Sequence, residues 1–154
     1  MPQFIFNSAE PITFHTGSPM IPGEQTIRFD DLAPMVRGYI EAMFFTDTGP
    51  DQAEDGLGPD CAFSDLAPET VAKVQHRCAL FAEVVNDAIA PGLTSHGFEQ
   101  IGRDLHYTSN GHGVGFWDRP EIYGQANADL FSDAARKLGG RDLYRGDDGK
   151  LYLS

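Results

Sequence analysis

The sequence predicts an α+β protein in which a small antiparallel β-sheet packs against two or three α-helices. Two long stretches carry apolar residues at intervals of three and four, which is typical of helices with one buried face. Two stretches in the C-terminal third surround Asn-Gly and Asp-Gly pairs, which favours two β-hairpins. At 154 residues and 41% hydrophobic content, the chain is long enough to bury one core, so we expect a single domain over residues 1–154.

Two further strands are expected near the N-terminus, at residues 3–6 and 12–15, where aromatic and β-branched residues gather. The glycine- and proline-containing stretch 16–24 predicts a loop. A first helix is expected to begin at Asp30 or Asp31, because either side chain can cap it. Its apolar residues recur at helical spacing and are Met35, Val36, Tyr39, Ile40, Met43 and Phe44.

The second helix is predicted to begin at Ser64 or Asp65 and to end at Pro91-Gly92. A continuous apolar face is formed by Val71, Val74, Cys78, Phe81, Val85 and Ala88. Cys78 is therefore expected to be a buried thiol. Such a helix must cover its apolar face with another helix or a sheet.

A third helix is predicted over residues 126–138, where the two glycines that follow would end it. Its expected apolar line is Leu130, Ala134 and Leu138. Residues 142–153 contain two short apolar runs around an Asp-Asp-Gly turn and are predicted to form the last hairpin.

The stretch from Asp104 to Asp118 is predicted to form the other hairpin, closed by Asn110-Gly111. Strand periodicity would separate a core face from an unusual face. The core face would hold Leu105, Tyr107, Val114 and Phe116, and the unusual face Asp104, His106, Thr108, Gly113, Gly115 and Trp117. Glycine weakens a strand unless a backbone, a ring or a ligand approaches closely. Close packing, a recognition patch and catalysis all remain open as interpretations.

In the catalytic interpretation, His106 or His112 acts as a general base that Asp104 or Asp118 orients. No nucleophile stands at a recognisable turn, so these four residues are candidates only. His96 adds another potential metal ligand, but the paired spacing of known metal sites is missing. We therefore expect no metal and no cofactor.

The charge is strongly uneven along the chain. Residues 1–102 hold 15 acidic and 4 basic residues, whereas residues 103–154 hold 8 and 7. Between Arg37 and Lys73 there are eight acidic residues and no basic one, mostly in an expected exposed loop. Such a surface repels nucleic acid and attracts a basic protein, although solubility alone is another interpretation. The residues expected to bind a partner are Glu41, Asp47, Asp51, Glu54, Asp55, Asp60, Asn110, His112 and Trp117.

The sequence has no apolar run that approaches the length of a membrane span, and its N-terminus lacks the pattern of a signal peptide. Two cysteines do not make a disulfide framework. We expect a cytoplasmic protein that binds neither membrane nor nucleic acid directly.

Residues 108–119 read Thr-Ser-Asn-Gly-His-Gly-Val-Gly-Phe-Trp-Asp-Arg. This stretch resembles the signature of a widespread family of small phage and prophage proteins, Thr-Arg-Asn-Gly-His-Gly-Ala-Gly-Phe-Trp-Asp-Arg. The resemblance extends over residues 30–154 and leaves residues 1–25 as an N-terminal extension. Further similar segments are residues 64–70, 126–138 and 143–150.

The chain departs from the family pattern at three places. Ser109 stands where the family has arginine, Arg103 where it has histidine, and Leu105-His106 where it has two aromatic residues. The family has no settled activity, so the resemblance implies a phage context without a mechanism. Phage accessory proteins of this size often inhibit host defence by occupying a protein surface.

We therefore expect a phage- or prophage-derived, non-enzymatic acidic module in the bacterial cytoplasm. It would inhibit a host defence protein or nucleic-acid-binding protein, in the manner of a DNA-mimicking anti-CRISPR or antirestriction protein. One alternative is a small hydrolase or metal-binding protein that uses His106 and His112. Another is a structural or virion-associated protein.

Overall fold

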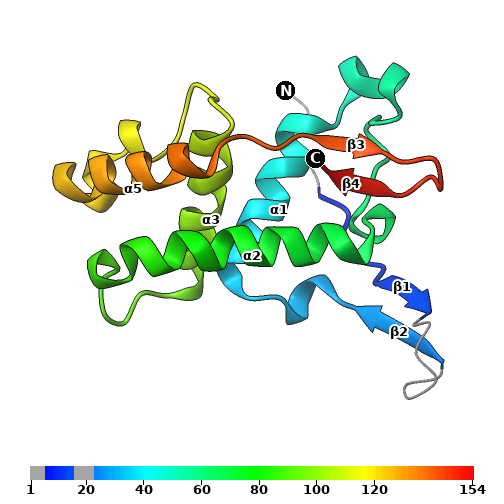
Figure 1. Ribbon diagram of the computed structural model, residues 1–154, viewed down its shortest axis with the longest axis horizontal. Helices are drawn as coiled ribbons and strands as arrows, with labels where there is room; N and C mark the ends of the chain where they lie inside the picture. Colours follow the sequence, from blue (N-terminus) through cyan, green and yellow to red (C-terminus); the bar gives the residue numbers. More distant parts are fainter. Residues whose placement is uncertain (1–5, 16–22) are drawn as a thin grey trace.

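The computed structural model describes residues 6–15 and 23–154 and confirms the α+β class, with 58% of these described residues helical (Figure 1). The longer elements are β1 (Ile12–His15), β2 (Glu24–Ile27), α1 (Pro34–Asp47), α2 (Pro68–Val85), α3 (Ser95–Ser109), α4 (Pro120–Tyr123), α5 (Gln125–Leu138), β3 (Leu143–Arg145) and β4 (Leu151–Leu153). Short 3-10 turns are η1 (Phe29–Asp31), η2 (Pro50–Asp55), η3 (Phe63–Asp65), η4 (Asn86–Ala88) and η5 (Phe116–Asp118).

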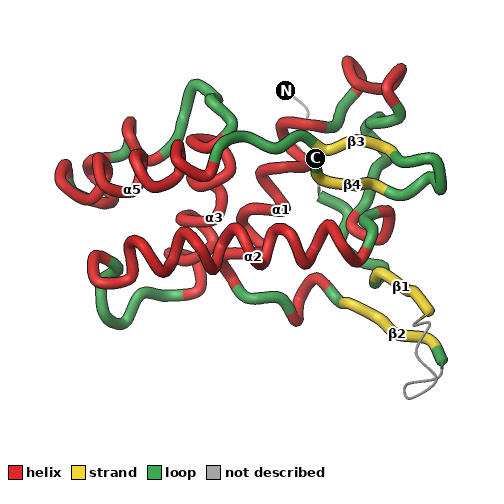
Figure 2. The backbone as a smooth tube through the Cα atoms, viewed as in Figure 1, coloured by secondary structure: helices red, strands yellow, loops and turns green. Residues whose placement is uncertain are grey.

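Helix α2 runs lengthwise across the molecule and packs against α1 and α5, and α3 packs against α1 and α5 (Figure 1). Figure 1 shows the β1–β2 and β3–β4 hairpins at one end and α5 at the other. Coloured by element type, the same view shows that strands occupy only this one end (Figure 2). The sheets are separate two-stranded ladders, and both are antiparallel. The core therefore forms mainly between helices.

The apolar faces predicted for the first two helices are confirmed. All six predicted residues of α1 are buried, and so are those of α2 from Val71 to Val85. Pro34 and Pro68 each occupy the first turn of their helix, where the missing N–H costs nothing. The predicted starts near Asp30 and Ser64 instead fall in or next to the 3-10 turns η1 and η3. These turns lead the chain into α1 and α2.

The hairpin predicted over Asp104 to Asp118 is wrong. Its first half is the end of α3, a helix that Thr94 caps by accepting a hydrogen bond from the Gly97 amide at 3.2 Å. Residues 104–109 alone alternate like a strand, but Ile101, Leu105 and Thr108 lie on one buried helical face. These six residues are too few to distinguish the period of a helix from the alternation of a strand.

Asn110-Gly111 ends α3 and does not close a hairpin. Gly111 has φ of +71°, its amide donates to the carbonyl of Thr108 at 3.2 Å, and the His112 amide donates to that of Tyr107 at 2.9 Å. This pair of bonds is the Schellman motif, in which glycine adopts the left-handed conformation after the last helical turn. The motif folds His112 back over the end of α3.

The strand predictions at the two ends have different outcomes. The β3–β4 hairpin and β1 are confirmed, whereas β2 occupies residues that were not predicted as a strand. The strand predicted at residues 3–6 and most of the loop at 16–24 lie outside the described residues. Strand β4 is tied to the start of α2, since the Thr70 hydroxyl donates to the carbonyl of Leu151 at 2.7 Å.

In α5, the predicted apolar residue Leu130 is 40% exposed and Phe131 is buried instead.

Two glycines allow α1 and α3 to pack closely. A Cβ atom on Gly102 would lie 1.9 Å from the carbonyl oxygen of Met35, and one on Gly38 would lie 1.9 Å from that of Glu99. No side chain fits between the two backbones at these points. Because the helices pack so closely, the C-terminal residues of α1 reach the last turn of α3.

Within residues 6–15 and 23–154, no helix has both the length and the apolar character that crossing a bilayer requires.

Candidate functional site

Three potential ligands from distant parts of the chain meet where α1 and α3 end. Asp47 is the last residue of α1, His106 lies in the last turn of α3, and His112 is the last residue of the Schellman motif. One ligand atom from each of them lies within 4.8 Å of the others. We call Asp47, His106 and His112 the histidine cluster. His106 is fully buried, while Asp47 and His112 are half-buried.

Hydrogen bonds determine which nitrogen of His106 carries the proton. The backbone amide of Arg141 donates to Asn110 Oδ1 at 2.9 Å, so the Asn110 amino group faces His106 Nδ1 at 3.2 Å. Nδ1 must therefore accept, and the hydrogen sits on Nε2. Nε2 donates to Thr46 Oγ1 at 2.7 Å, and this hydroxyl donates to Asp47 Oδ1 at 2.9 Å. A chain of hydrogen bonds thus links α1 to the end of α3.

Burial changes the acidity of two groups in the cluster. It lowers the pKa of His106 to about 3, with smaller contributions from His112 and Arg77. Burial also raises the pKa of Asp47 above its ordinary value, against the hydrogen bonds from Thr46 and the Leu143 amide. His106 is therefore a neutral imidazole at neutral pH, held at both ring nitrogens. It is poorly suited to the general-base role of the catalytic interpretation, which favours a pKa near the working pH.

The two acids proposed to orient the histidines are engaged elsewhere. Asp104 is fully buried and accepts bonds from Arg119 at 2.9 Å, Tyr123 at 2.7 Å and Gln100 at 3.0 Å. Asp118 accepts from the Gly115 amide at 2.9 Å and stabilises the turn η5. The structure thus separates the four catalytic candidates into a histidine pair and two structural carboxylates.

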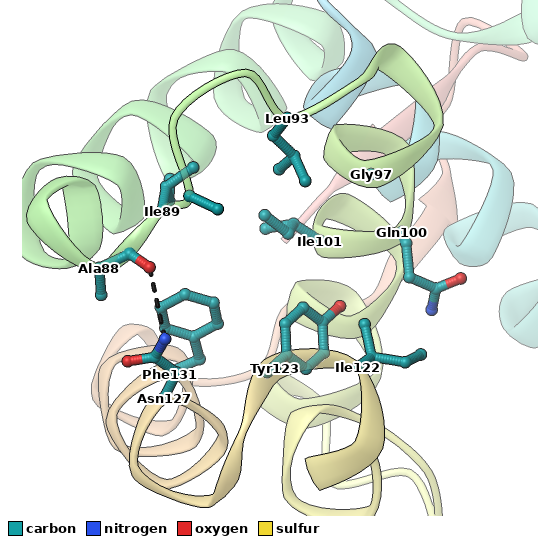
Figure 3. A pocket seen from close by; sticks show the side chains of 11 residues that line it. Ala88, Ile89, Leu93, Gly97, Gln100, Ile101, Ile122, Tyr123, Asn127 and Phe131 are labelled. Atoms are coloured by element: carbon teal, nitrogen blue, oxygen red, sulfur yellow. Dashed lines mark hydrogen bonds between the residues drawn. The ribbon is translucent and has the colours of Figure 1, made fainter.

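The Asp104 network borders an apolar cavity of about 120 Å³. Figure 3 shows Ile89, Leu93, Ile101 and Phe131 around this cavity, with Tyr123 at its edge. The Tyr123 hydroxyl donates to Asp104, and burial together with Asp104 raises its pKa. The polar side chains at this edge, Tyr123 and Gln100, thus donate their hydrogen bonds to Asp104 of the same chain.

The glycine-rich stretch after α3 is mainly a structural device. A Cβ atom on Gly115 would lie 2.1 Å from the Thr108 hydroxyl, whereas one on Gly113 would meet nothing within 4 Å. Close packing therefore explains Gly115 and does not explain Gly113. Phe116 is buried in the core, and Trp117 remains 45% exposed.

The acidic residues predicted to bind a partner divide into two groups. Glu41 forms an ion pair with Arg103, with Oε2 and Nη1 3.7 Å apart, and Asp47 belongs to the histidine cluster. The other four are exposed: Asp51, Glu54, Asp55 and Asp60. None of these four forms an ion pair within 4.0 Å in the part of the chain that the structure describes.

These four carboxylates lie on a compact loop, residues 48–60, which we call the acidic loop. The Gly49 amide donates to the carbonyl of Leu57 at 2.9 Å and closes the loop at its base. Arg145 of β3 donates to the carbonyl of Gly56 at 2.6 Å, and Cys61 is buried beneath this contact. The loop follows directly after Asp47, so the charged surface and the histidine cluster adjoin.

Sequence reasoning grouped His106 with His112 as candidates but placed Asp47 among the residues that bind a partner, so it did not bring the three together. It also missed Thr46, which connects them, and it assigned Asn110 to binding although its amide joins α3 to the Arg141 backbone. A span of 60 residues separates Thr46 from His106, so no local spacing reveals the contact.

No protein-family model, curated protein or solved structure matches this chain.

Proposed function

We propose that the protein is a non-enzymatic acidic module that binds a basic surface of another protein through the acidic loop. The supporting observation is the group of four exposed carboxylates without ionic partners within the described chain. Backbone hydrogen bonds hold the loop in one conformation, which lowers the entropic cost of binding. Trp117 is an exposed aromatic residue of the type that anchors interfaces, and we include it in the binding surface.

The partner in this proposal is a nucleic-acid-binding protein of a bacterial host. Its cationic site would attract the acidic loop over long range, because the chain carries a net charge of −12. Occupying that site would compete with nucleic acid. The resemblance to phage proteins supplies only the phage context of this proposal, and the role against host defence is an association with phage accessory proteins of similar size.

The test is capture of partners from bacterial lysate at low and high salt, followed by competition between this protein and DNA for each captured protein. The quadruple variant Asp51→Asn, Glu54→Gln, Asp55→Asn, Asp60→Asn should bind between about fourfold and several hundredfold more weakly at low salt, since exposed ion pairs contribute about 0.2–1 kcal/mol each.

A matched control neutralises four exposed acids far from the loop in sequence: Glu83, Asp87, Glu121 and Asp133. It makes the same change in net charge and should keep nearly all of the affinity. Equal losses in the two variants would mean that net charge alone attracts the partner. Binding that does not respond to salt or to the loop variant would overturn the proposal.

A further inference from the structure

We propose that the histidine cluster binds a divalent transition-metal ion of the zinc type. Two imidazoles and one carboxylate are the donor set that such ions take in proteins, and the three donors already lie within 4.8 Å of one another. This site is separate from the proposed partner surface in its chemistry and does not depend on it.

The surroundings of the cluster orient its ligands. Asp47 accepts from the Thr46 hydroxyl at 2.9 Å and from the Leu143 amide at 3.2 Å, which holds its carboxylate in place. His106 is held at one ring nitrogen by Thr46 and at the other by Asn110. A metal on Nδ1 would take the place of the Asn110 amino group and leave Nε2 donating to Thr46, and such an outer partner is typical of histidine ligands. Asn110 keeps a second acceptor, the His106 carbonyl at 2.9 Å.

An ion can reach this position from solvent. Asp47 and His112 are half-buried, and the segment from Gly111 to Gly115 covers the cluster only in part, with three of its five residues exposed. The neighbouring acidic loop raises the local concentration of cations. Three protein ligands also leave a coordination position for water, as in open zinc sites.

The experiment is titration of metal-free full-length protein, without a histidine tag, with Zn²⁺ in a calorimeter and with Co²⁺ in a visible spectrometer. We expect one ion per chain and ligand-field absorption from bound Co²⁺. His112→Ala and Asp47→Asn should each weaken binding at least as much as loss of an outer partner does, about 10–100-fold. His96→Ala and Asp51→Asn are matched controls, because both residues are exposed outside the cluster, and they should bind like the wild type.

A second measurement does not depend on how the variants fold. Zn²⁺ should shift the imidazole ¹⁵N resonances of His106 and His112 in the wild type and leave those of His76 and His96 unchanged. The proposal is overturned if no ion binds, if the controls lose as much affinity as the cluster variants, or if other histidines respond instead. The quadruple acidic-loop variant keeps all three ligands and should still bind Zn²⁺, so failure of the partner proposal remains distinguishable.

Discussion

His106 connects most of the candidate site through its two ring nitrogens. Nε2 contacts Thr46 of α1, and Nδ1 contacts Asn110, which in turn bonds to the backbone of Arg141. Its ring also lies against Tyr39 and His112, with centroids 5.1 and 5.4 Å away. A charged imidazolium would lose the Nδ1 acceptor and remain buried, so this residue is stable in the fold only while it is neutral.

We predict that metal-free protein loses stability as the pH falls from about 6.5 towards 3. Unfolded His106 has an ordinary pKa of about 6.5, and burial lowers the folded value to about 3. Between these values the unfolded state binds a proton that the folded state does not, so acid favours unfolding. Urea unfolding at several pH values measures the loss in the free energy of unfolding, which reaches about 3 kcal/mol at pH 4.

The matched variant for this prediction is His106→Gln, whose amide preserves polar contacts but does not titrate. It should be less stable at neutral pH and show a shallower decline towards pH 4. If the free energy of unfolding falls equally with pH in the wild type and the variant, His106 is not the titrating group.

At the scale of elements, the contact between α1 and α3 determines where the site forms. Gly38 and Gly102 bring the helix backbones together, and the two C-terminal ends then place Asp47 and His106 side by side. The Schellman motif at Gly111 adds His112. The geometry of the site is therefore a consequence of helix packing and helix termination.

We predict that Gly102→Ala destabilises the protein by about 2 kcal/mol or more, because its Cβ would overlap the Met35 carbonyl and overpacking costs about 1–3 kcal/mol. Helix propensity alone predicts the opposite sign, a gain of about 1 kcal/mol. Gly113→Ala is the control, since its Cβ meets nothing within 4 Å, and its effect should stay within about 0.5 kcal/mol. Thermal or urea unfolding measures the stability of both variants. Equal losses of stability in Gly102→Ala and Gly113→Ala would contradict the close packing of α1 against α3.

At the scale of the whole molecule, charge is the dominant property. The net charge of −12 opposes the compact state through self-repulsion, and four of the acidic residues gather on one loop beside the histidine cluster. The same charge attracts basic proteins and cations. Both proposals draw on this field, although they depend on different side chains.

We predict that the melting temperature rises as KCl increases from about 0.01 to about 0.3 M, because the screening length falls from about 30 Å to below 10 Å. The quadruple acidic-loop variant should melt at a higher temperature in low salt and respond less to KCl. Calorimetry measures both changes. A salt response of equal size in the two proteins would mean that the acidic loop contributes little to the repulsion.

The sequence by itself determined the features that depend on neighbouring residues. Apolar spacing located the buried faces of α1 and α2, and the Asp-Gly pair located the turn between β3 and β4. The uneven charge was also evident without a structure. Each of these follows from local periodicity, from turn chemistry or from composition, so no distant contact is needed.

Only the tertiary structure decided what Asn110-Gly111 does and which residues surround His106. The same pair suits a hairpin turn and a helix end, and the helical face that begins before residue 104 packs on α1 and favours the helix. Thr46, which contacts His106 Nε2, comes from α1, and the Arg141 amide that orients Asn110 beside His106 comes from the segment before β3; both lie far away in sequence. Such contacts arise when packing buries apolar faces together, and no spacing along the chain encodes them.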